Sequence, residues 1–310
     1  MLIRDLLDNE YSPIRALRPK AVLQFRLTIT RWSDFLGRGP VLTDLQGLPV
    51  QAFLAARRAV VSQATVLKDR VHICALWTYA AKRRLVAEFP TLPPMRAPKR
   101  IPRAYRLEDV SAIVRVCRSL PGVVSGLPRG LYYSTLVRSC WETGERIGAH
   151  RALEWADVDL SQRAIIFRAE NRKGGSADIR REITAGLAEW LDELRIHASS
   201  LVWPWERHET LLWHEFGKIC VIAEVVPRGF HGFRKASASY LAMAGGDASA
   251  HLGHASPQTT RDHYLDPSIC RPLISPVDLL PALDLAEPAF CPRKPDPQEN
   301  FLTPLDLPSR

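Results

Sequence analysis

The sequence predicts a mainly helical protein of two domains, the second of which contains one small β-hairpin. Apolar residues recur at three- and four-residue spacing through most of the 310 residues, as in helices with one buried face. A basic, proline-rich stretch at 90–103 separates two such regions, and a two-residue period is found at 164–183. A chain of this length with 46% hydrophobic residues can bury more than one core.

The first predicted domain, residues 1–89, is helical. One face of its first helix carries five apolar residues: Val22, Phe25, Ile29, Trp32 and Leu36. Arg26 and Arg31 fall between them and are expected to face outward. Further helices are expected at 50–61 and from residue 65 onward.

Residues 90–103 are predicted to be an extended basic linker, because their five prolines cannot continue a helix. The second domain, 104–270, should contain helices at 107–117, 131–141, 147–155, 185–197, 213–225 and 233–244. Strands at 164–167 and 179–183, joined by a glycine-rich turn, should form its hairpin. Residues 271–310 hold nine prolines and are interpreted as a tail that does not form a compact unit.

The positive charge is concentrated in the first third of the chain. Residues 1–103 hold 18 Lys and Arg against 7 Asp and Glu, whereas the remainder holds 24 against 26. Such a region attracts polyanions, of which nucleic acid is the commonest; an anionic membrane is the alternative, although no lipidation motif supports it. Nine basic residues are candidates for DNA contact: Arg26, Arg31, Lys82, Arg83, Arg84, Arg96, Lys99, Arg100 and Arg103. Residues 82–84 equally suit the C-terminus of a helix.

The cysteines and the N-terminus indicate a cytoplasmic protein. The six cysteines are widely spread, without a C-x-x-C pair or disulfide spacing, which is typical of reduced thiols. The first ten residues do not resemble a secretory leader, and no apolar run is long enough to span a membrane.

Residues 231–264 combine groups suited to phosphoryl chemistry: His231, Arg234, His254 and Tyr264. Ser256-Pro257 should begin, and Asp266-Pro267 should end, a short helix that carries Tyr264. A tyrosine hydroxyl has a pKa of about 10, so it needs neighbouring cations and a base before it can attack at neutral pH. Arginines can hold the non-bridging oxygens of a phosphodiester, and the histidines lack carboxylate partners at ligand spacing, so we expect neither a metal nor another cofactor.

These residues occur in motifs that resemble a known family. HGFR at 231–234, LGHAS at 252–256, TT at 259–260 and Tyr264 are similar to the C-terminal signature of the tyrosine recombinases, the phage integrase family. TGERIG at 143–148, followed by ALEWADVD at 152–159, resembles the family's first-arginine motif. Taken singly, Tyr264 and His231 are more often structural than catalytic, but the four motifs in order reverse that expectation. The resemblance covers roughly residues 19–267.

The resemblance implies a fold and a mechanism. It implies a helical, SAM-like core-binding domain before an α+β catalytic domain. It implies these roles: Tyr264 as the nucleophile that forms a 3′-phosphotyrosyl bond, Arg146 and Arg234 as the phosphate clamp, His254 as a hydrogen-bond donor to the same phosphate, His231 in proton transfer, and Lys173 as the acid for the leaving 5′-oxygen.

The implied activity is site-specific recombination or integration of mobile DNA, without metal or ATP, by a homotetramer assembled on double-stranded DNA. Two alternatives remain open: strand-swivelling relaxation like that of a type IB topoisomerase, and DNA binding by a non-catalytic relative.

Three features of the sequence depart from the family pattern: two residues and one spacing. Ala149 stands where an acidic residue usually supports the first arginine, so support for Arg146 is expected from elsewhere, with Glu145 as the candidate. Lys235 replaces a common histidine. The spacing from Arg234 to His254 is short, which suggests a trimmed loop at residues 245–246.

Overall fold

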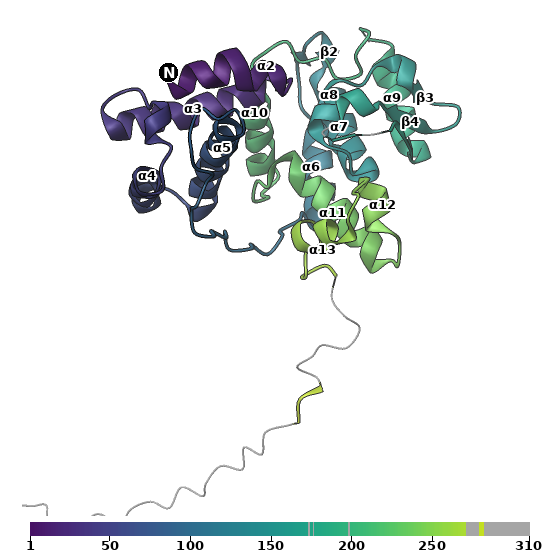
Figure 1. Ribbon diagram of the computed structural model, residues 1–310. Helices are drawn as coiled ribbons and strands as arrows, with labels where there is room; N and C mark the ends of the chain where they lie inside the picture. The colour runs from purple at the N-terminus through teal and green to yellow at the C-terminus, as the bar shows by residue number, and fades with distance from the viewer. Residues whose placement is uncertain (173, 176, 198, 271–278, 282–310) are drawn as a thin grey trace, which may run out of the picture.

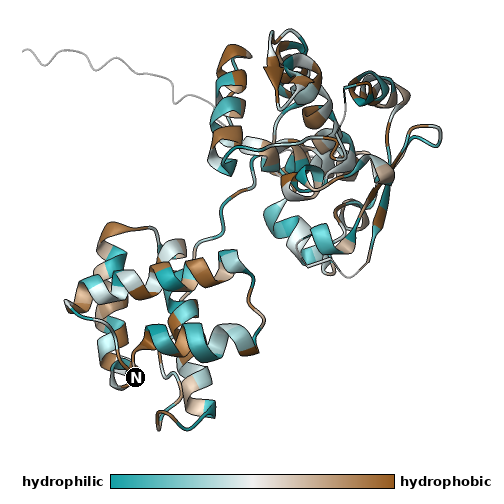
Figure 2. Ribbon diagram, turned by 90° about the horizontal axis from the view of Figure 1, so that it is seen from above, coloured by the Kyte–Doolittle hydropathy of each residue, from teal (hydrophilic) through white to brown (hydrophobic). Residues whose placement is uncertain are grey.

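The computed structural model describes residues 1–172, 174–175, 177–197, 199–270 and 279–281. They form two helical lobes joined by an extended segment (Figures 1 and 2). Each lobe has its own hydrophobic core, one built from residues between Ile3 and Ala80 and the other from residues between Ala104 and Ile269. The predicted mainly helical fold with a small antiparallel sheet is confirmed.

The N-terminal lobe consists of short and long helices. They are α1 (Ile3–Asp5), a π-helical segment (Leu6–Tyr11), α2 (Ser12–Ile14), α3 (Pro19–Leu36), a 3-10 turn (Leu42–Asp44), α4 (Gly47–Val60) and α5 (Gln63–Lys82). Proline at the first position of α3 costs no hydrogen bond, because the first N–H groups of a helix have no partner within it. The helical segment before Pro19 was not predicted; it buries Ile3, Leu6 and Leu7 in this core.

A buried carboxylate in α5 determines where one predicted DNA-contact residue points. Asp69 is 1% exposed and accepts hydrogen bonds from Thr28 Oγ1 (2.9 Å), Arg31 Nη1 (2.6 Å) and Arg57 Nε (3.1 Å). Arg31 therefore faces outward only in part: its side chain is 32% exposed, but its guanidinium pairs with Asp69, because a buried charge must be paired. Arg26 remains exposed and pairs with Asp8 (3.1 Å).

Residues 90–103 contain neither helix nor strand, as their prolines predict. The segment is tied to both lobes. Gln63 Nε2 donates to the carbonyl of Arg96 (2.8 Å), while Lys99 Nζ pairs with Asp262 (2.7 Å) in the second lobe. The backbone N–H of Ala104 donates to Asp266 Oδ2 (2.7 Å), so the linker enters the second lobe beside the end of the helix that precedes Tyr264.

The C-terminal lobe surrounds the long helix α7. Its elements are α6 (Leu107–Arg118), β1 (Val123–Val124), β2 (Leu127–Pro128), α7 (Arg129–Thr143), α8 (Ile147–Arg151), a 3-10 turn (Trp155–Asp157), β3 (Val158–Asp159), β4 (Ala164–Phe167), a 3-10 turn (Ala169–Asn171), β5 (Ile179–Glu182), α9 (Ala185–Arg195), α10 (Glu209–Ile222), α11 (Gly229–Met243), α12 (Ala248–Leu252) and α13 (Pro257–His263). Helices α6, α9 and α11 pack on α7, which is buried along most of its length.

The predicted hairpin is present but belongs to a larger sheet. β4 pairs antiparallel with β5, from Ala164 opposite Glu182 to Phe167 opposite Ile179. β3 was not predicted; it pairs with the other edge of β4, so the sheet order is β3-β4-β5. The two-residue strands β1 and β2 form a second, unpredicted ribbon. Strands this short carry too few residues for a two-residue period to be recognised.

Several helix bounds differ from the prediction for identifiable reasons. α8 ends at Arg151, not at 155, because the backbone N–H of Trp155 donates to the carbonyl of Ser200 (3.0 Å). α10 and α11 each begin four residues earlier than predicted, and their first turns bury Leu212 and Phe230.

Most of the predicted tail, residues 271–310, lies outside the described residues, as does Cys291. The other five cysteines are free thiols. Within the part of the chain that the structure describes, none of the helices combines the length and the apolar character needed to cross a membrane.

Candidate active site

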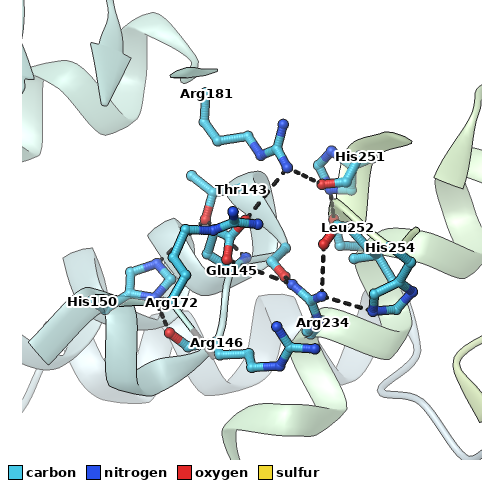
Figure 3. Close-up of polar contacts among 12 residues, drawn as sticks. Thr143, Glu145, Arg146, His150, Arg172, Arg181, Arg234, His251, Leu252 and His254 are labelled. Atoms are coloured by element: carbon cyan, nitrogen blue, oxygen red, sulfur yellow. Dashed lines mark hydrogen bonds and ion pairs between the residues drawn. The ribbon is translucent and has the colours of Figure 1, made fainter. Parts of the chain in front are cut away.

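Five of the six residues predicted to carry the chemistry lie within the described part of the C-terminal lobe; the sixth, Lys173, lies outside it. Arg146 immediately precedes α8, His231 and Arg234 lie on α11, His254 follows α12, and Tyr264 is the residue after α13. Figure 3 shows Arg146 and His254 approaching Arg234 from two sides. The folded chain therefore brings together residues that lie more than a hundred positions apart.

The turn between α7 and α8 presents Arg146. Gly144 ends α7 with φ +62°, a left-handed conformation that favours glycine. A Cβ atom at this position would lie 2.6 Å from His251 Nε2, so only glycine lets the turn approach α12 this closely. The turn buries Glu145 and leaves Arg146 partly exposed.

Helix α11 supplies two of the candidate residues from one face. His231 and Arg234 are three positions apart, which places them on neighbouring turns of the same side. Phe230 and Phe233 are buried in the lobe's core. The position of the polar pair is thus determined by the packing of the apolar residues beside it.

Arg234 is fully buried and makes three directional contacts. Its Nη1 donates to the carbonyl of Gly144 (2.5 Å), and its Nη2 donates to the carbonyl of Leu252 (2.8 Å) and to His254 Nε2 (3.0 Å). Burial and then Arg146 lower the pKa of Arg234 to about 10. The guanidinium therefore stays charged at neutral pH, held between α7, α11 and α12.

His254 is held as one tautomer. Arg234 can only donate, so His254 Nε2 must accept and the ring proton must lie on Nδ1. His254 Nδ1 then donates to Thr260 Oγ1 (2.8 Å), which lies 2.9 Å from Ser249 Oγ. Burial, followed by Arg234 and Arg146, lowers the pKa of His254 to about 4, so the ring is neutral at pH 7.

Tyr264 lies among the other candidate residues. Its ring centroid is 5.1 Å from that of His231 and 4.6 Å from that of His254, and Arg234 Cζ is 5.3 Å from the same centroid. The side chain is 7% exposed. Ser256 precedes α13 as predicted, but its side chain makes no capping hydrogen bond. The backbone N–H of Tyr264 donates to the carbonyl of Thr260 (2.9 Å), which holds Tyr264 against the end of α13.

His231 is neutral at pH 7 and can therefore accept a proton. Desolvation by the surrounding protein, and then Lys235, Arg234 and Arg146, lower its pKa to about 4, although the residue itself is exposed. A neutral imidazole next to the Tyr264 ring can accept a proton, whereas a protonated one could not.

Glu145 differs from its expected role. It was expected to support Arg146, but its carboxylate instead pairs with Arg172 (3.2 Å), Arg181 (3.4 Å) and Arg234 (3.7 Å). Sequence reasoning did not include Arg172 or Arg181 among the site residues. The available signal was an acidic residue inside the first-arginine motif, directly before Arg146, but the sequence alone could not identify its partners.

A surface pocket of about 480 Å³ opens at this cluster. It is lined by Arg146, Arg172, Gly174, Gly175, Ala177, Ile179, Gly253, His254, Ala255, Ser256 and Thr259. Two arginines and a hydrogen-bonding imidazole on the wall of one pocket favour an anion. Elsewhere in the described residues as well, no three His, Cys, Asp or Glu side chains gather as a metal ion would require.

Most of the predicted DNA-contact residues are exposed. Lys82, Arg83 and Arg84 follow one another at the end of α5, and Arg96, Arg100 and Arg103 are exposed on the linker. Arg83 lies 3.9 Å from Glu10. Lys99 is exposed but paired with Asp262, so DNA would compete with that carboxylate for it.

The stability of the protein should fall as the pH is lowered from about 6.5 to about 4. His150, His251 and His254 each have a pKa lowered to about 4, mainly by burial, whereas unfolded histidine titrates near 6.5. In this window the unfolded chain binds protons that the folded chain does not, so protonation favours unfolding. Urea midpoints should agree at pH 8 and 7 and then decrease at pH 6 and 5. Equal midpoints at pH 7 and 5 would contradict the lowered pKa values.

The chain is similar to proteins of known family and structure. The family described as the phage integrase family matches residues 106–269. No curated protein matches the sequence. A lambda integrase dimer bound to a COC′ core site is 16% identical, with a TM-score of 0.65, over 86% of this chain and 78% of that one.

Two further structures have a similar fold. The Tn1549 transposon integrase in complex with transposon right end DNA is 13% identical, with a TM-score of 0.66, over 85% of this chain and 95% of that one. The XerH site-specific recombinase bound to difH substrate is 16% identical, with a TM-score of 0.63, over 83% of this chain and 80% of that one. At sequence identities this low, the similarity to these three structures establishes a shared fold only.

Proposed function

The chain belongs to the phage integrase family, and from this premise we propose that it is a site-specific DNA recombinase that uses Tyr264 to cut and rejoin strands. The observation that carries the proposal is the position of the Tyr264 ring, between the neutral rings of His231 and His254 and beside the guanidinium of Arg234. A tyrosine in contact with two cation-flanked imidazoles, next to an arginine-lined pocket, suits attack on a phosphodiester.

The proposed reaction begins with a DNA phosphate in the pocket beside Arg146. Arg146 and His254 line that pocket, and Arg234 lies directly behind His254. The two guanidiniums stabilise the negative charge that develops on the non-bridging oxygens. His254 donates to the phosphate from Nε2 once that nitrogen carries a proton, which requires the ring to leave the tautomer that donates from Nδ1 to Thr260. None of these steps requires a metal ion or ATP.

Proton transfer completes the cycle. The Tyr264 oxygen forms a bond to phosphorus while its proton passes to His231, and the bond from phosphorus to the 5′-oxygen breaks. We assign the proton for that leaving oxygen to Lys173, on the family resemblance, since this residue lies outside the described part. Attack of a 5′-hydroxyl on the phosphotyrosine reverses both transfers and seals a strand.

We propose double-stranded DNA as the partner and a homotetramer as the active assembly. Among structures of similar fold, one contains a lambda integrase dimer on a core site and another a lambda integrase tetramer bound to a Holliday junction. In this chain, residues 1–89 and 104–270 would hold the duplex from two sides, and residues 90–103 would follow its backbone. The five free cysteines suit the reducing cytoplasm, where we place the exchange of mobile DNA.

Covalent capture tests the proposed function. A nicked suicide duplex, from which the cut fragment diffuses away, should leave the protein attached to the 3′-phosphate. Mass spectrometry should locate the nucleotide on the Tyr264 peptide. Relaxation of supercoiled DNA that lacks any recombination site would instead favour the topoisomerase alternative, and specific binding without cleavage would favour a non-catalytic relative.

The basic linker should contribute to DNA affinity through phosphate contacts. Replacing Arg96, Arg100 and Arg103 together by Ala should weaken binding to all sequences. Each lost phosphate contact should reduce the slope of log K against log salt concentration by about 0.9. Fluorescence anisotropy over a salt series measures this slope. The matched control is Arg118→Ala, an exposed arginine of α6 that pairs with Glu193 (2.6 Å); an unchanged slope in the triple variant would remove the linker from the interface.

A further inference from the structure

Glu145 is a buried carboxylate surrounded by three arginines (Figure 3). Its side chain is 1% exposed, and Arg172, Arg181 and Arg234 are 6%, 13% and 0% exposed. Its Oε1 accepts from Arg172 Nη2 (3.2 Å) and Arg181 Nη2 (3.4 Å), while its Oε2 lies 3.7 Å from Arg234 Nη1. Burial by itself opposes ionisation, but attraction to Arg234 and Arg172 and the other contacts lower the pKa of Glu145 below its usual range.

The charges of this group do not balance. Three guanidiniums surround one carboxylate, and a fourth cation, Arg146, lies beside them on the wall of the pocket. Buried charges of like sign repel strongly unless a counter-charge separates them. Glu145 therefore offsets part of the repulsion, and the positive charge that remains favours an anion in the pocket.

The three arginines come from separate parts of the fold. Arg234 is on α11, Arg181 is on β5, and Arg172 follows the 3-10 turn after β4. Arg181 also donates to the backbone carbonyl of His251 in α12. Gly253 has φ +63°, and a Cβ atom there would lie 2.6 Å from Arg172 Nη2, so the glycine of the LGH motif leaves space for this arginine. Through these arginines Glu145 links the turn before Arg146 to β5 and α11, and Arg181 extends the link to α12.

We propose that Glu145 is a positioning residue for strand cleavage, acting through Arg234 and Arg172. The inference rests on the proposed function. Glu145 holds the charge of Arg234 at the back of the pocket, and its bond to Arg172 anchors the residue that directly precedes Lys173 in the sequence.

The role predicts a charge-dependent defect in Glu145→Gln. Glutamine has nearly the same shape and can still accept from Arg172 and Arg181, but it no longer offsets the repulsion among the guanidiniums. Displacement of the clamp by a fraction of an ångström to about 1 Å should slow single-turnover cleavage of the suicide duplex by about 10²-fold. DNA affinity should change little, since this pocket holds one phosphate among many contacts. Glu145→Asp, which keeps the charge, should lose less activity than Glu145→Gln.

A neutral substrate separates positioning from loss of fold. A methylphosphonate at the scissile position has no negative charge, so its cleavage depends less on a correctly placed guanidinium. The cleavage rate of the unaltered protein, divided by that of Glu145→Gln, should therefore fall from about 10² on phosphate DNA to a few-fold on methylphosphonate DNA. The matched control is Glu142→Gln on the same helix, where Glu142 pairs with Arg138 (2.8 Å) and accepts from the N–H of Thr184 (2.8 Å); it should cleave both substrates normally.

The possible outcomes separate the positioning role of Glu145 from a purely structural role and from failure of the proposed function. Cleavage of phosphate DNA by Glu145→Gln at the rate of the unaltered protein would overturn the positioning role. An equal defect on both substrates would also overturn it and would assign Glu145 to folding alone. Absence of any covalent adduct with the unaltered protein would instead overturn the proposed function, and the positioning role with it.

Discussion

Tyr264→Phe is expected to form no covalent adduct with DNA while keeping its DNA affinity. The substitution removes one oxygen and leaves the ring in place between His231 and His254. Loss of a nucleophile typically lowers the rate of a covalent catalyst by about 10⁴-fold or more, because general catalysis and binding alone remain. A suicide duplex analysed by denaturing electrophoresis measures the adduct, and a gel shift measures binding.

The control for this result is a second tyrosine of the same lobe. The Tyr240 hydroxyl accepts from the N–H of Leu107 (2.8 Å), away from the pocket. Tyr240→Phe should retain cleavage and lose only a little stability, about 1 kcal/mol for one hydrogen bond. An adduct that persists undiminished in Tyr264→Phe would show that another residue is the nucleophile.

Arg234→Lys is expected to lower the rate of cleavage by about 10²- to 10³-fold, with little change in DNA binding. Lysine keeps the positive charge, but its single ammonium nitrogen replaces the planar, multi-donor guanidinium of arginine. It cannot reproduce the contacts of Arg234 to Gly144, Leu252 and His254. Loss of the hydrogen bond from Arg234 should also reduce the preference of His254 for the tautomer whose Nδ1–H donates to Thr260.

Single-turnover rates on the suicide duplex measure this effect. The control is Arg129→Lys at the start of α7, where Arg129 pairs with Glu215 (3.0 Å) on α10. Arg129→Lys should cleave DNA at close to the normal rate. A rate for Arg234→Lys within a few-fold of the unaltered protein would show that charge alone, without fixed geometry, is sufficient at this position.

The sequence predicted the long helices well and the short elements poorly. The first helix of the N-terminal lobe was expected from its spacing of Phe25, Ile29 and Trp32, and it forms as α3. The segment from Ile3 to Ile14 was not predicted, although it contributes four side chains to the core, those of Ile3, Leu6, Leu7 and Tyr11. A segment this short obtains its stability from the lobe it packs against, which is not visible in the sequence.

The candidate site was predicted residue by residue, whereas its supporting contacts were not. Motif order identified Arg146, His231, Arg234, His254 and Tyr264, and the structure brings these five side chains to one region. Their roles remain predictions, as does that of Lys173. The partner of Glu145 was predicted wrongly, since proximity in the sequence favoured Arg146 whereas the fold brings Arg172, Arg181 and Arg234 to its carboxylate.

By itself, the sequence determined the helical class, the basic linker, the concentration of charge in the first third and the set of candidate catalytic residues. These features depend on residue type and on spacing within a few turns of chain. Only the tertiary structure decided which buried charges pair: Arg31 with Asp69 in one lobe, and three arginines with Glu145 in the other. The physical reason is that a charge removed from water must bind whichever opposite charge the packed elements bring within reach, however distant that residue is along the chain.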